Sequence, residues 1–285
     1  MSNTAHTKPQ QNIVIVGLGL IGGSLAKAIS AKTNHLVAGA DYNPAVIESA
    51  LACGAIAHKA DDAALAAADL IILCLYPQDC IDFIQQKGSL LRGKTVTDTC
   101  GIKIAICGEM TRLAEQFDFV FVGGHPMAGK EQNGFSASDA DLFQNASYLV
   151  VPCGAPQSAV DALADLAVQI GAARVMLTTP EHHDEMIAFT SQVPHLLACA
   201  YVSSPLCPQH PGYSAGSYRD VSRVARINEE LWSELFLDNR GPLVEELDVL
   251  LHNLSRIRDA VAQNDKETLR ALLRHAREIK ESLGE

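Results

Sequence analysis

The stretch that decides the fold is "IVIVGLGLIGGSLAKAI", residues 13–29. Four β-branched residues run directly into glycines at 17, 19 and 22, and an alanine-rich helical pattern follows. This G-x-G-x-x-G spacing provides a tight turn at Gly17, close approach of the backbone to a ligand at Gly19, and close packing of strand and helix at Gly22. The stretch therefore predicts a β-strand, a glycine-rich turn and a helix, in that order.

The same stretch predicts a dinucleotide site. Leu20 and Ile21 fall at the start of the predicted helix, where free N–H groups and the positive end of the helix dipole can bind a pyrophosphate. A second apolar run ends at Asp41, where an acid can accept hydrogen bonds from the adenosine ribose and repel a 2′-phosphate. No arginine follows in "DYNP", so the sequence favours NAD over NADP. The alternative, glycines that only make a turn, would leave Asp41 unexplained.

Working outward, residues 12–178 alternate short β-rich runs with alanine-rich helical segments. Continuous apolar runs, as opposed to alternating ones, are typical of strands that are buried on both faces. Helices between the strands require crossover connections, which predict a mainly parallel sheet. The predicted strands are 13–16, 36–40, 69–75, 95–98, 119–122, 147–151 and 174–177.

The character of the chain changes near residue 179. The segments that follow show helical periodicity without a convincing strand, and a loop rich in proline and glycine interrupts them at 204–216. Helices with an apolar stripe and no sheet must pack on each other or on a second copy. The predicted helices are 183–203, 218–237, 240–261 and 265–282.

These patterns predict an α/β protein with two domains. We expect a Rossmann-type, mainly parallel sheet domain over 12–178 and an all-helical substrate and dimerisation domain over 179–285. The polar residues 1–11 are expected to form a disordered tail.

Composition excludes several functions. A formal net charge of −11 argues against nucleic acids and anionic membranes as partners, because both need a basic face. The longest apolar stretch, residues 63–76, contains an aspartate and is too short to span a bilayer. The eight cysteines form no C-x-x-C pair and do not cluster with histidines, so no metal site is expected. With no signal peptide, reduced thiols in the cytoplasm are the economical interpretation.

A candidate for chemistry lies in "FVFVGGHPMAGKEQNGF", residues 119–135. His125 comes just after the predicted strand 119–122, and Asp98 ends another strand. Because ligands of open parallel sheets bind at the carboxyl ends of the strands, both residues should lie on the nicotinamide side. A neutral imidazole there can accept the proton of a substrate hydroxyl while hydride leaves the same carbon. Alternatively, His125 only hydrogen bonds a backbone group at the strand end.

Two segments of the helical half add candidates. His183 and His195 bracket a helix in "HHDEMIAFTSQVPH", while Arg219 and Arg223 lie one helical turn apart in "GSYRDVSRVARI". An arginine is the natural bidentate partner of a carboxylate, so these arginines could bind a carboxylate substrate. Alternatively, Arg219 forms ion pairs on a solvated face.

Together these motifs resemble the prephenate/arogenate dehydrogenase family over essentially the whole chain. The resemblance implies a Rossmann domain followed by a helical dimerisation domain, with the active site between them. It also implies an oxidative decarboxylation, in which hydride passes from ring C4 to NAD(P)+, a ring carboxylate leaves as CO2 and the ring becomes aromatic. The strings that carry it are "GLGLIGGSLA", "TD…K" at 97–103, "HPMAGKEQNGF", "HHDEMIAFTSQVPH" and "YRDVSRVA".

The resemblance also implies roles for single residues. His125 would accept a hydrogen bond or the proton from the ring hydroxyl, and His195 would position the substrate or the cofactor. Arg223 would bind a substrate carboxylate. Glu131 would lie near the mouth of the site, paired with an arginine.

Two positions depart from the family pattern. Gly101 in "DTCGIK" stands where the family commonly has a serine that supports the histidine or the substrate hydroxyl. Thr99, a backbone N–H or water would have to replace that serine. Gln192 in "SQVPH" stands where the family commonly has a histidine. Both positions are expected beside the substrate, and the choice between prephenate and arogenate stays open.

Two other functions are weighed against this one. Dehydrogenases of the β-hydroxyacid or imine-reductase type share both halves of the architecture, but they typically use a lysine on a helix of the second domain. This chain has no lysine between Glu131 and Lys266. A non-catalytic NAD-sensing regulator would not need His125, His195 and Arg223 together.

Overall fold

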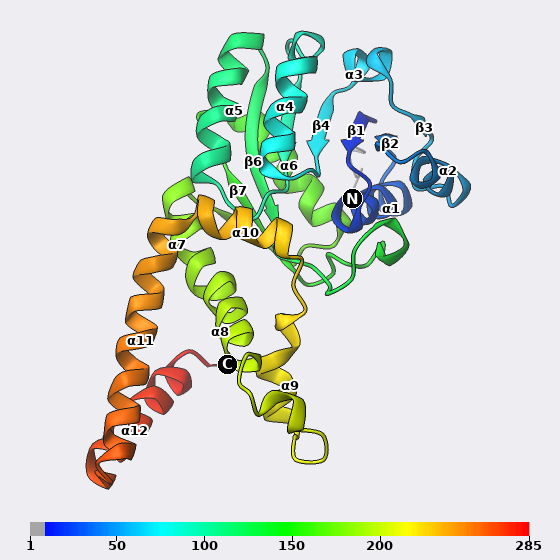
Figure 1. The fold of residues 1–285 in the computed structure, drawn as a ribbon. Helices are drawn as coiled ribbons and strands as arrows, with labels where there is room; N and C mark the ends of the chain where they lie inside the picture. Colours follow the sequence, from blue (N-terminus) through cyan, green and yellow to red (C-terminus); the bar gives the residue numbers. More distant parts are fainter. Residues whose placement is uncertain (1–8, 285) are drawn as a thin grey trace, which may run out of the picture.

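The computed structural model describes residues 9–284, which form a sheet domain and a helical part that projects from it (Figure 1). Most of the predicted disordered tail, residues 1–8, lies outside the described residues. Gln11, the last residue of that predicted tail, donates its backbone N–H to His35 Nδ1 over 3.1 Å.

One eight-stranded sheet, in the order β3-β2-β1-β4-β5-β6-β7-β8, forms the first domain. All neighbouring strands run parallel except β6 and β7, so the predicted mainly parallel sheet is confirmed. The strands are β1 Asn12–Val16, β2 Leu36–Ala40, β3 His58–Lys59, β4 Leu70–Leu73, β5 Thr95–Asp98, β6 Val120–Pro126, β7 Ser147–Val151 and β8 Arg174–Leu177.

Helices cover both faces of this sheet (Figure 1). Along β1, Ile13 and Ile15 face a core that includes residues of α1, α2 and α6. Val14 and Val16 face the opposite core, with residues of α4 and α5. This two-sided burial explains why the run is continuously apolar. The helices are α1 Leu20–Lys32, α2 Pro44–Ala52, α3 Asp62–Ala67, α4 Pro77–Lys87, α5 Ile104–Phe117 and α6 Gln157–Ile170.

The sheet corrects the predicted end of one strand. The strand predicted to end at residue 122 continues to Pro126, because its last residues pair antiparallel with β7, with His125 opposite Leu149. His125 therefore lies within β6, not just after it. The two-residue strand β3 was not predicted, since His58 and Lys59 are polar and exposed.

The helical part follows directly on β8. Its helices are α7 Pro180–Ile187, α8 Val193–Val202, α9 Gly216–Ser222, α10 Glu229–Asp238, α11 Arg240–Ala262 and α12 Lys266–Ser282. Residue 179, where we expect the boundary between the two domains, thus lies between β8 and α7. The domain boundary itself stays a prediction. None of the helices within residues 9–284 combines the length and hydropathy that a membrane-spanning helix requires.

The prediction of one helix over 218–237 is wrong. The chain leaves the helical path at Arg226, where ψ is 82°, and resumes it after Asn228. Asn228 caps α10 by accepting a hydrogen bond from the backbone N–H of Leu231 over 3.2 Å. Asparagine at this position stabilises a new helix start in place of a continuous helix.

A carboxylate on α7 joins the helical part to the sheet domain. Asp184 Oδ1 accepts a hydrogen bond from the Lys103 backbone N–H over 2.7 Å, and Oδ2 accepts one from that of Ile104 over 2.8 Å. These N–H groups belong to the N-cap residue and to the first residue of α5, where a negative charge also complements the helix dipole. The contact fixes α7 against the sheet edge that carries β5 and β6.

Candidate active site

The glycine-rich turn after β1 has the backbone that its sequence predicts. Gly17 has a positive φ of 87°, and a Cβ there would lie 2.5 Å from the carbonyl oxygen of Cys74. A Cβ on Gly22 would collide with the carbonyl of Gly17. Gly19, in contrast, has no atom within 4 Å of its Cβ position. The open side of the turn can therefore admit a ligand up to the backbone.

This turn opens onto the place where β1 lies between β2 and β4, the switch point of the sheet at which dinucleotides bind. Helix α1 begins at Leu20, so Leu20 and Ile21 lie in its first turn, where N–H groups have no intrahelical acceptor. Asp41 stands beside them after β2, and its Oδ2 accepts a hydrogen bond from the Leu18 N–H over 2.8 Å. These residues fit a bound dinucleotide.

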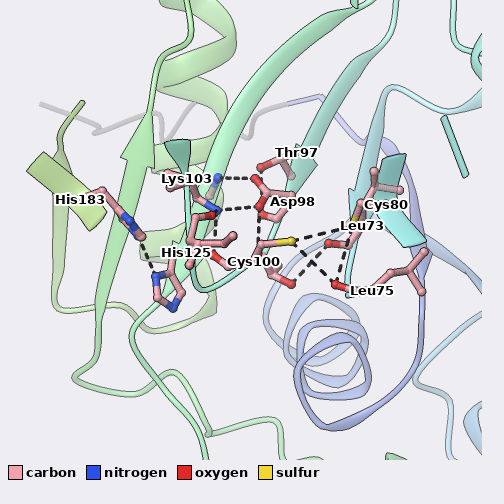
Figure 2. A network of polar contacts seen from close by, with 12 residues as sticks. Leu73, Leu75, Cys80, Thr97, Asp98, Cys100, Lys103, His125 and His183 are labelled. Atoms are coloured by element: carbon pink, nitrogen blue, oxygen red, sulfur yellow. Dashed lines mark hydrogen bonds and ion pairs between the residues drawn. The ribbon is translucent and has the colours of Figure 1, made fainter. Parts of the chain in front are cut away.

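Asp98 has a different role from the cofactor contact that the sequence predicts. Its side chain is fully buried and is 2.6 Å from Lys103 Nζ, with further hydrogen bonds from the backbone N–H groups of Cys100 and Gly124. Burial opposes the charge of Lys103, but the adjacent Asp98 carboxylate raises the pKa of that ammonium. The buried pair holds the loop after β5 against β6, next to His125 (Figure 2).

His125 is linked to a second histidine on α7. Its Nδ1 lies 2.9 Å from His183 Nε2 (Figure 2). His183 Nδ1 in turn lies 2.7 Å from Asp184 Oδ1. His183 and Asp184 are both buried, whereas His125 is partly exposed. An Asp–His–His chain thus runs from the helical part to the end of β6.

The partners in this chain fix the proton positions. A carboxylate only accepts hydrogen bonds, so His183 Nδ1 carries a proton and, in the neutral ring, His183 Nε2 is an acceptor. The proton in the contact between the two rings therefore belongs to His125 Nδ1. His125 Nε2 is then unprotonated, has no hydrogen-bond partner within residues 9–284, and points away from His183 and Lys103 (Figure 2).

The surroundings also keep His125 uncharged. Burial, helped by the neighbouring His183 and Lys103, holds the pKa of His125 well below its usual range. Burial also lowers the pKa of His183, against the opposing effect of Asp184. At neutral pH both rings are neutral, so His125 Nε2 is available as a proton acceptor.

A second group of side chains surrounds His195 on α8. The imidazole stacks on Trp232 with ring centroids 3.9 Å apart, and His195 Nδ1 lies 2.8 Å from the carbonyl oxygen of Ser191. Arg223 Nη1 lies 2.6 Å from Glu131 Oε1, and both charges act on the pKa of His195, which burial lowers. His195, Arg223 and Glu131 are therefore neighbours, although they come from three separate segments.

Comparison with known proteins identifies this arrangement. Residues 25–177 match the model of the prephenate dehydrogenase nucleotide-binding domain, and residues 179–275 match that of the prephenate dehydrogenase dimerization domain. The chain belongs to the prephenate dehydrogenase family. The predicted family, the fold and the enzyme class, an NAD-dependent dehydrogenase, are confirmed.

Three similar proteins illustrate the breadth of the prephenate dehydrogenase family. Cyclohexadienyl dehydrogenase of Zymomonas mobilis is 31% identical over 272 residues, which cover 91% of each chain. The structure of arogenate dehydrogenase from Synechocystis is 25% identical, with a TM-score of 0.80 over 95% of this chain and 99% of that one. Prephenate dehydrogenase from Aquifex aeolicus, in complex with hydroxyphenyl propionate and NAD+, shares the fold at 24% identity, with a TM-score of 0.85 over 96% and 99% of the two chains.

Gly101 and Gln192, the two positions expected to depart from the family pattern, differ in the space around them. A Cβ on Gly101 would meet only Leu235 side-chain atoms, at 3.6 and 3.8 Å, so the position has room for a serine. Gln192 is buried, with Nε2 3.0 Å from the carbonyl oxygen of Leu235 and Oε1 accepting a hydrogen bond from Asn239 over 2.7 Å. The expectation that the Gln192 side chain contacts substrate is therefore wrong, since both ends of its amide are engaged inside the helical part.

Other predicted and unpredicted residues complete the site. Arg219 is exposed and forms no ion pair within residues 9–284, unlike Arg223. Sequence reasoning missed the contacts of Lys103, His183 and Asp184. The available signals were an acid directly after His183 and the lysine that ends the string "TD…K".

Proposed function

We propose that the protein catalyses the NAD-dependent oxidative decarboxylation of prephenate to 4-hydroxyphenylpyruvate, of arogenate to tyrosine, or of both, within tyrosine biosynthesis. The observation that carries the proposal is the neutral imidazole of His125, with Nε2 free, at the sheet edge that also carries the dinucleotide turn. The family membership supplies the substrate class.

In this proposal His125 accepts one proton and later returns it. Its Nε2 accepts the proton of the hydroxyl on ring C4 as the C4–H bond breaks. A bound NAD+ would supply the acceptor for the hydride that leaves C4. The bond to the ring carboxylate then breaks, CO2 departs, and its electron pair enters the ring, which becomes aromatic. The new phenolate takes the proton back from His125, so no net proton is released.

The second group of side chains suits the carboxylates of the substrate. Arg223 and His195 both come from the helical part and lie next to each other, and Trp232 holds the His195 ring by stacking. Arg223 would exchange its contact with Glu131 for a bidentate contact to a carboxylate. His195 Nε2 is left as the free nitrogen, because Nδ1 faces a carbonyl that can only accept.

Asp41 supports a preference for NAD over NADP. Its carboxylate is oriented by the backbone N–H groups of Leu18 and Asn43, at 2.8 and 2.9 Å. An oriented negative charge at this place can accept hydrogen bonds from ribose hydroxyls and repels a 2′-phosphate.

A homodimer through the helical part completes the proposal. Helix α11 extends away from the sheet domain and α12 folds back from its far end (Figure 1). Leu251, Leu254, Ile257 and Val261 recur at helical spacing on α11 and are each at least 36% exposed. We name these four residues the α11 stripe. An exposed stripe of this kind is suited to pairing with a second copy, as the dimerization-domain match suggests.

The alternative is a two-domain dehydrogenase of the β-hydroxyacid or imine-reductase type. Such an enzyme would need a catalytic lysine from the helical part. The first lysine after Lys130 is Lys266, at the start of α12. Lys103 cannot serve in its place, because it is fully buried in its contact with Asp98.

A substrate panel tests the proposal. Prephenate, arogenate and several β-hydroxyacids are each incubated with NAD+ or NADP+, while reduced nicotinamide and released CO2 are measured together. We expect one of the two cyclohexadienyl substrates to give both products in equal amounts, with NAD+ preferred. Turnover of a hydroxyacid without CO2 would contradict the proposal.

A further inference from the structure

We propose that His183 and Asp184 are positioning residues, which hold His125 in the tautomer with Nε2 unprotonated and share the positive charge when Nε2 takes a proton. The inference rests on the proposed function for its role in catalysis. The tautomer of His125 can be measured without any substrate.

Asp184 can only act as the acceptor that begins the chain. Its carboxylate accepts hydrogen bonds from the backbone N–H groups of Lys103 and Ile104 and from His183 Nδ1. Its two oxygens therefore face N–H groups whose direction the α5 backbone fixes. Because α5 and α7 hold it from both sides, the carboxylate cannot turn away from His183.

His183 passes this orientation to His125. The ring is buried, and its two nitrogens are both used, one by Asp184 at 2.7 Å and one by His125 at 2.9 Å. A flip of His183 would place carbon atoms where both hydrogen bonds now lie. The ring nitrogens would then lack partners in a buried place, so the observed orientation is strongly preferred.

The hydrogen-bonded series of Asp184, His183 and His125 can also hold the positive charge that arises when His125 takes a proton. When His125 Nε2 accepts the hydroxyl proton, the proton on His125 Nδ1 can move to His183 Nε2, and the positive charge then lies next to the Asp184 carboxylate. When the ring becomes aromatic both protons return along the same path, so atoms and charge balance. The other charged groups near His183 are Lys103 and Asp98, which pair with each other over 2.6 Å.

His183 is the residue that supplies the hydrogen-bond partner of His125 Nδ1. Gly101, in the loop after β5, has no side chain that could do so. His183 makes the contact to His125 from the opposite domain. The tautomer of His125 therefore depends on docking of α7 against the sheet domain.

The tautomer is measured by nuclear magnetic resonance of the full-length protein, labelled with ¹⁵N in histidine only. His125→Asn and His183→Gln assign the two rings. At neutral pH we expect His125 and His183 both to show a protonated Nδ1 and an unprotonated Nε2. In His183→Leu the His125 ring should move toward the Nε2-protonated form that prevails for a free histidine side chain in water. A protonated Nε2 on His125 in the unmodified protein would overturn the inference.

Steady-state kinetics then separate orientation from charge sharing. His183→Gln can accept the hydrogen bond from His125 Nδ1 through its Oε1, but it cannot take a proton. We expect kcat to fall by at least about tenfold in His183→Gln and further in His183→Leu, with KM changed less than about threefold. Equal kcat in His183→Leu and the unmodified enzyme would refute the positioning role.

His182→Leu is the matched control, because His182 is the exposed neighbour of His183 and should show no change. The two proposals fail in distinguishable ways. Full turnover in His125→Asn would remove the proposed function and leave the tautomer result standing. A normal His183→Leu enzyme with an inactive His125→Asn enzyme would remove only this inference.

Discussion

Arg223 Nη1, on the helical part, lies 2.6 Å from Glu131 Oε1, on the loop that follows β6. Both side chains are about half exposed, and a hydrogen bond from its own backbone N–H, together with Arg223, lowers the pKa of Glu131. An ion pair this exposed contributes little to stability. We interpret it as a contact that a substrate carboxylate can replace.

Arg223→Ala tests this interpretation. A charge-assisted hydrogen bond contributes roughly 1.5–3 kcal/mol, so KM for the substrate should rise by about 10- to 100-fold while kcat changes less. Arg219→Ala is the control, since Arg219 is exposed and unpaired within the described residues. An unchanged KM in Arg223→Ala and a raised KM in Arg219→Ala would assign the carboxylate contact to Arg219.

Asp41→Asn tests the cofactor preference. The asparagine keeps the size of the side chain and can still accept the hydrogen bond from Leu18, but it removes the charge that repels a 2′-phosphate. We expect the ratio of kcat/KM for NAD+ to that for NADP+ to fall at least about tenfold, or ~1.4 kcal/mol. A ratio equal to that of the unmodified enzyme would exclude Asp41 from the ribose contact.

The depressed pKa values of His125 and His183 predict a stability that depends on pH. Unfolded histidines bind protons below about pH 6.5, whereas these two folded rings resist protonation. The unfolded state then binds more protons, so the free energy of unfolding should fall as pH drops below about 6.5, by up to roughly 1.4 kcal/mol per pH unit for each ring.

Urea denaturation between about pH 8 and about pH 5 measures this dependence. His125→Asn should flatten the slope, because it removes one of the two rings. His182→Asn, a substitution at the exposed neighbouring histidine, is the control variant. Identical slopes in His125→Asn and the unmodified protein would show that His125 titrates normally.

If two copies pair through the α11 stripe, a charge placed in that stripe should weaken the dimer. Leu254→Glu puts a carboxylate into the stripe on both copies of a symmetric dimer. Loss of about 1.5–3 kcal/mol per buried side chain should raise the dimer dissociation constant by at least about 100-fold. Sedimentation velocity over a concentration series measures this constant, with Asn253→Glu on the adjacent exposed position as control. A monomeric unmodified protein would refute the proposed homodimer.

Local sequence patterns predicted most of the sheet because most of its strands are buried runs rich in apolar and β-branched residues, although the edge strand β8 is largely exposed. Residues 36–40, 95–98, 147–151 and 174–177 were all predicted with the observed bounds. The strand β3 escaped prediction, since a two-residue exposed edge strand has no apolar signal. The extension of β6 to Pro126 arises from antiparallel pairing with β7, which no pattern local to the strand encodes.

Motifs in the sequence select candidate site residues, but they do not encode the contacts between those residues. His125 and His195 could be selected from their motifs, whereas the partner of His125 lies 58 residues away on α7. The buried contact of Lys103 with Asp98 likewise depends on how the loop after β5 folds back. Gln192 was misjudged because its burial is decided by α10 and Asn239, which are remote in the sequence.

The central claim is that the uncharged imidazole of His125 accepts the proton of the ring hydroxyl. The most direct measurement is the turnover of His125→Asn with saturating NAD+ and the preferred cyclohexadienyl substrate, alongside the affinity of the variant for NAD+. A general base contributes roughly 10²- to 10⁴-fold, so kcat should fall by at least about 100-fold while NAD+ affinity stays within about twofold of the unmodified enzyme. A kcat within a few-fold of the unmodified enzyme would contradict the claim.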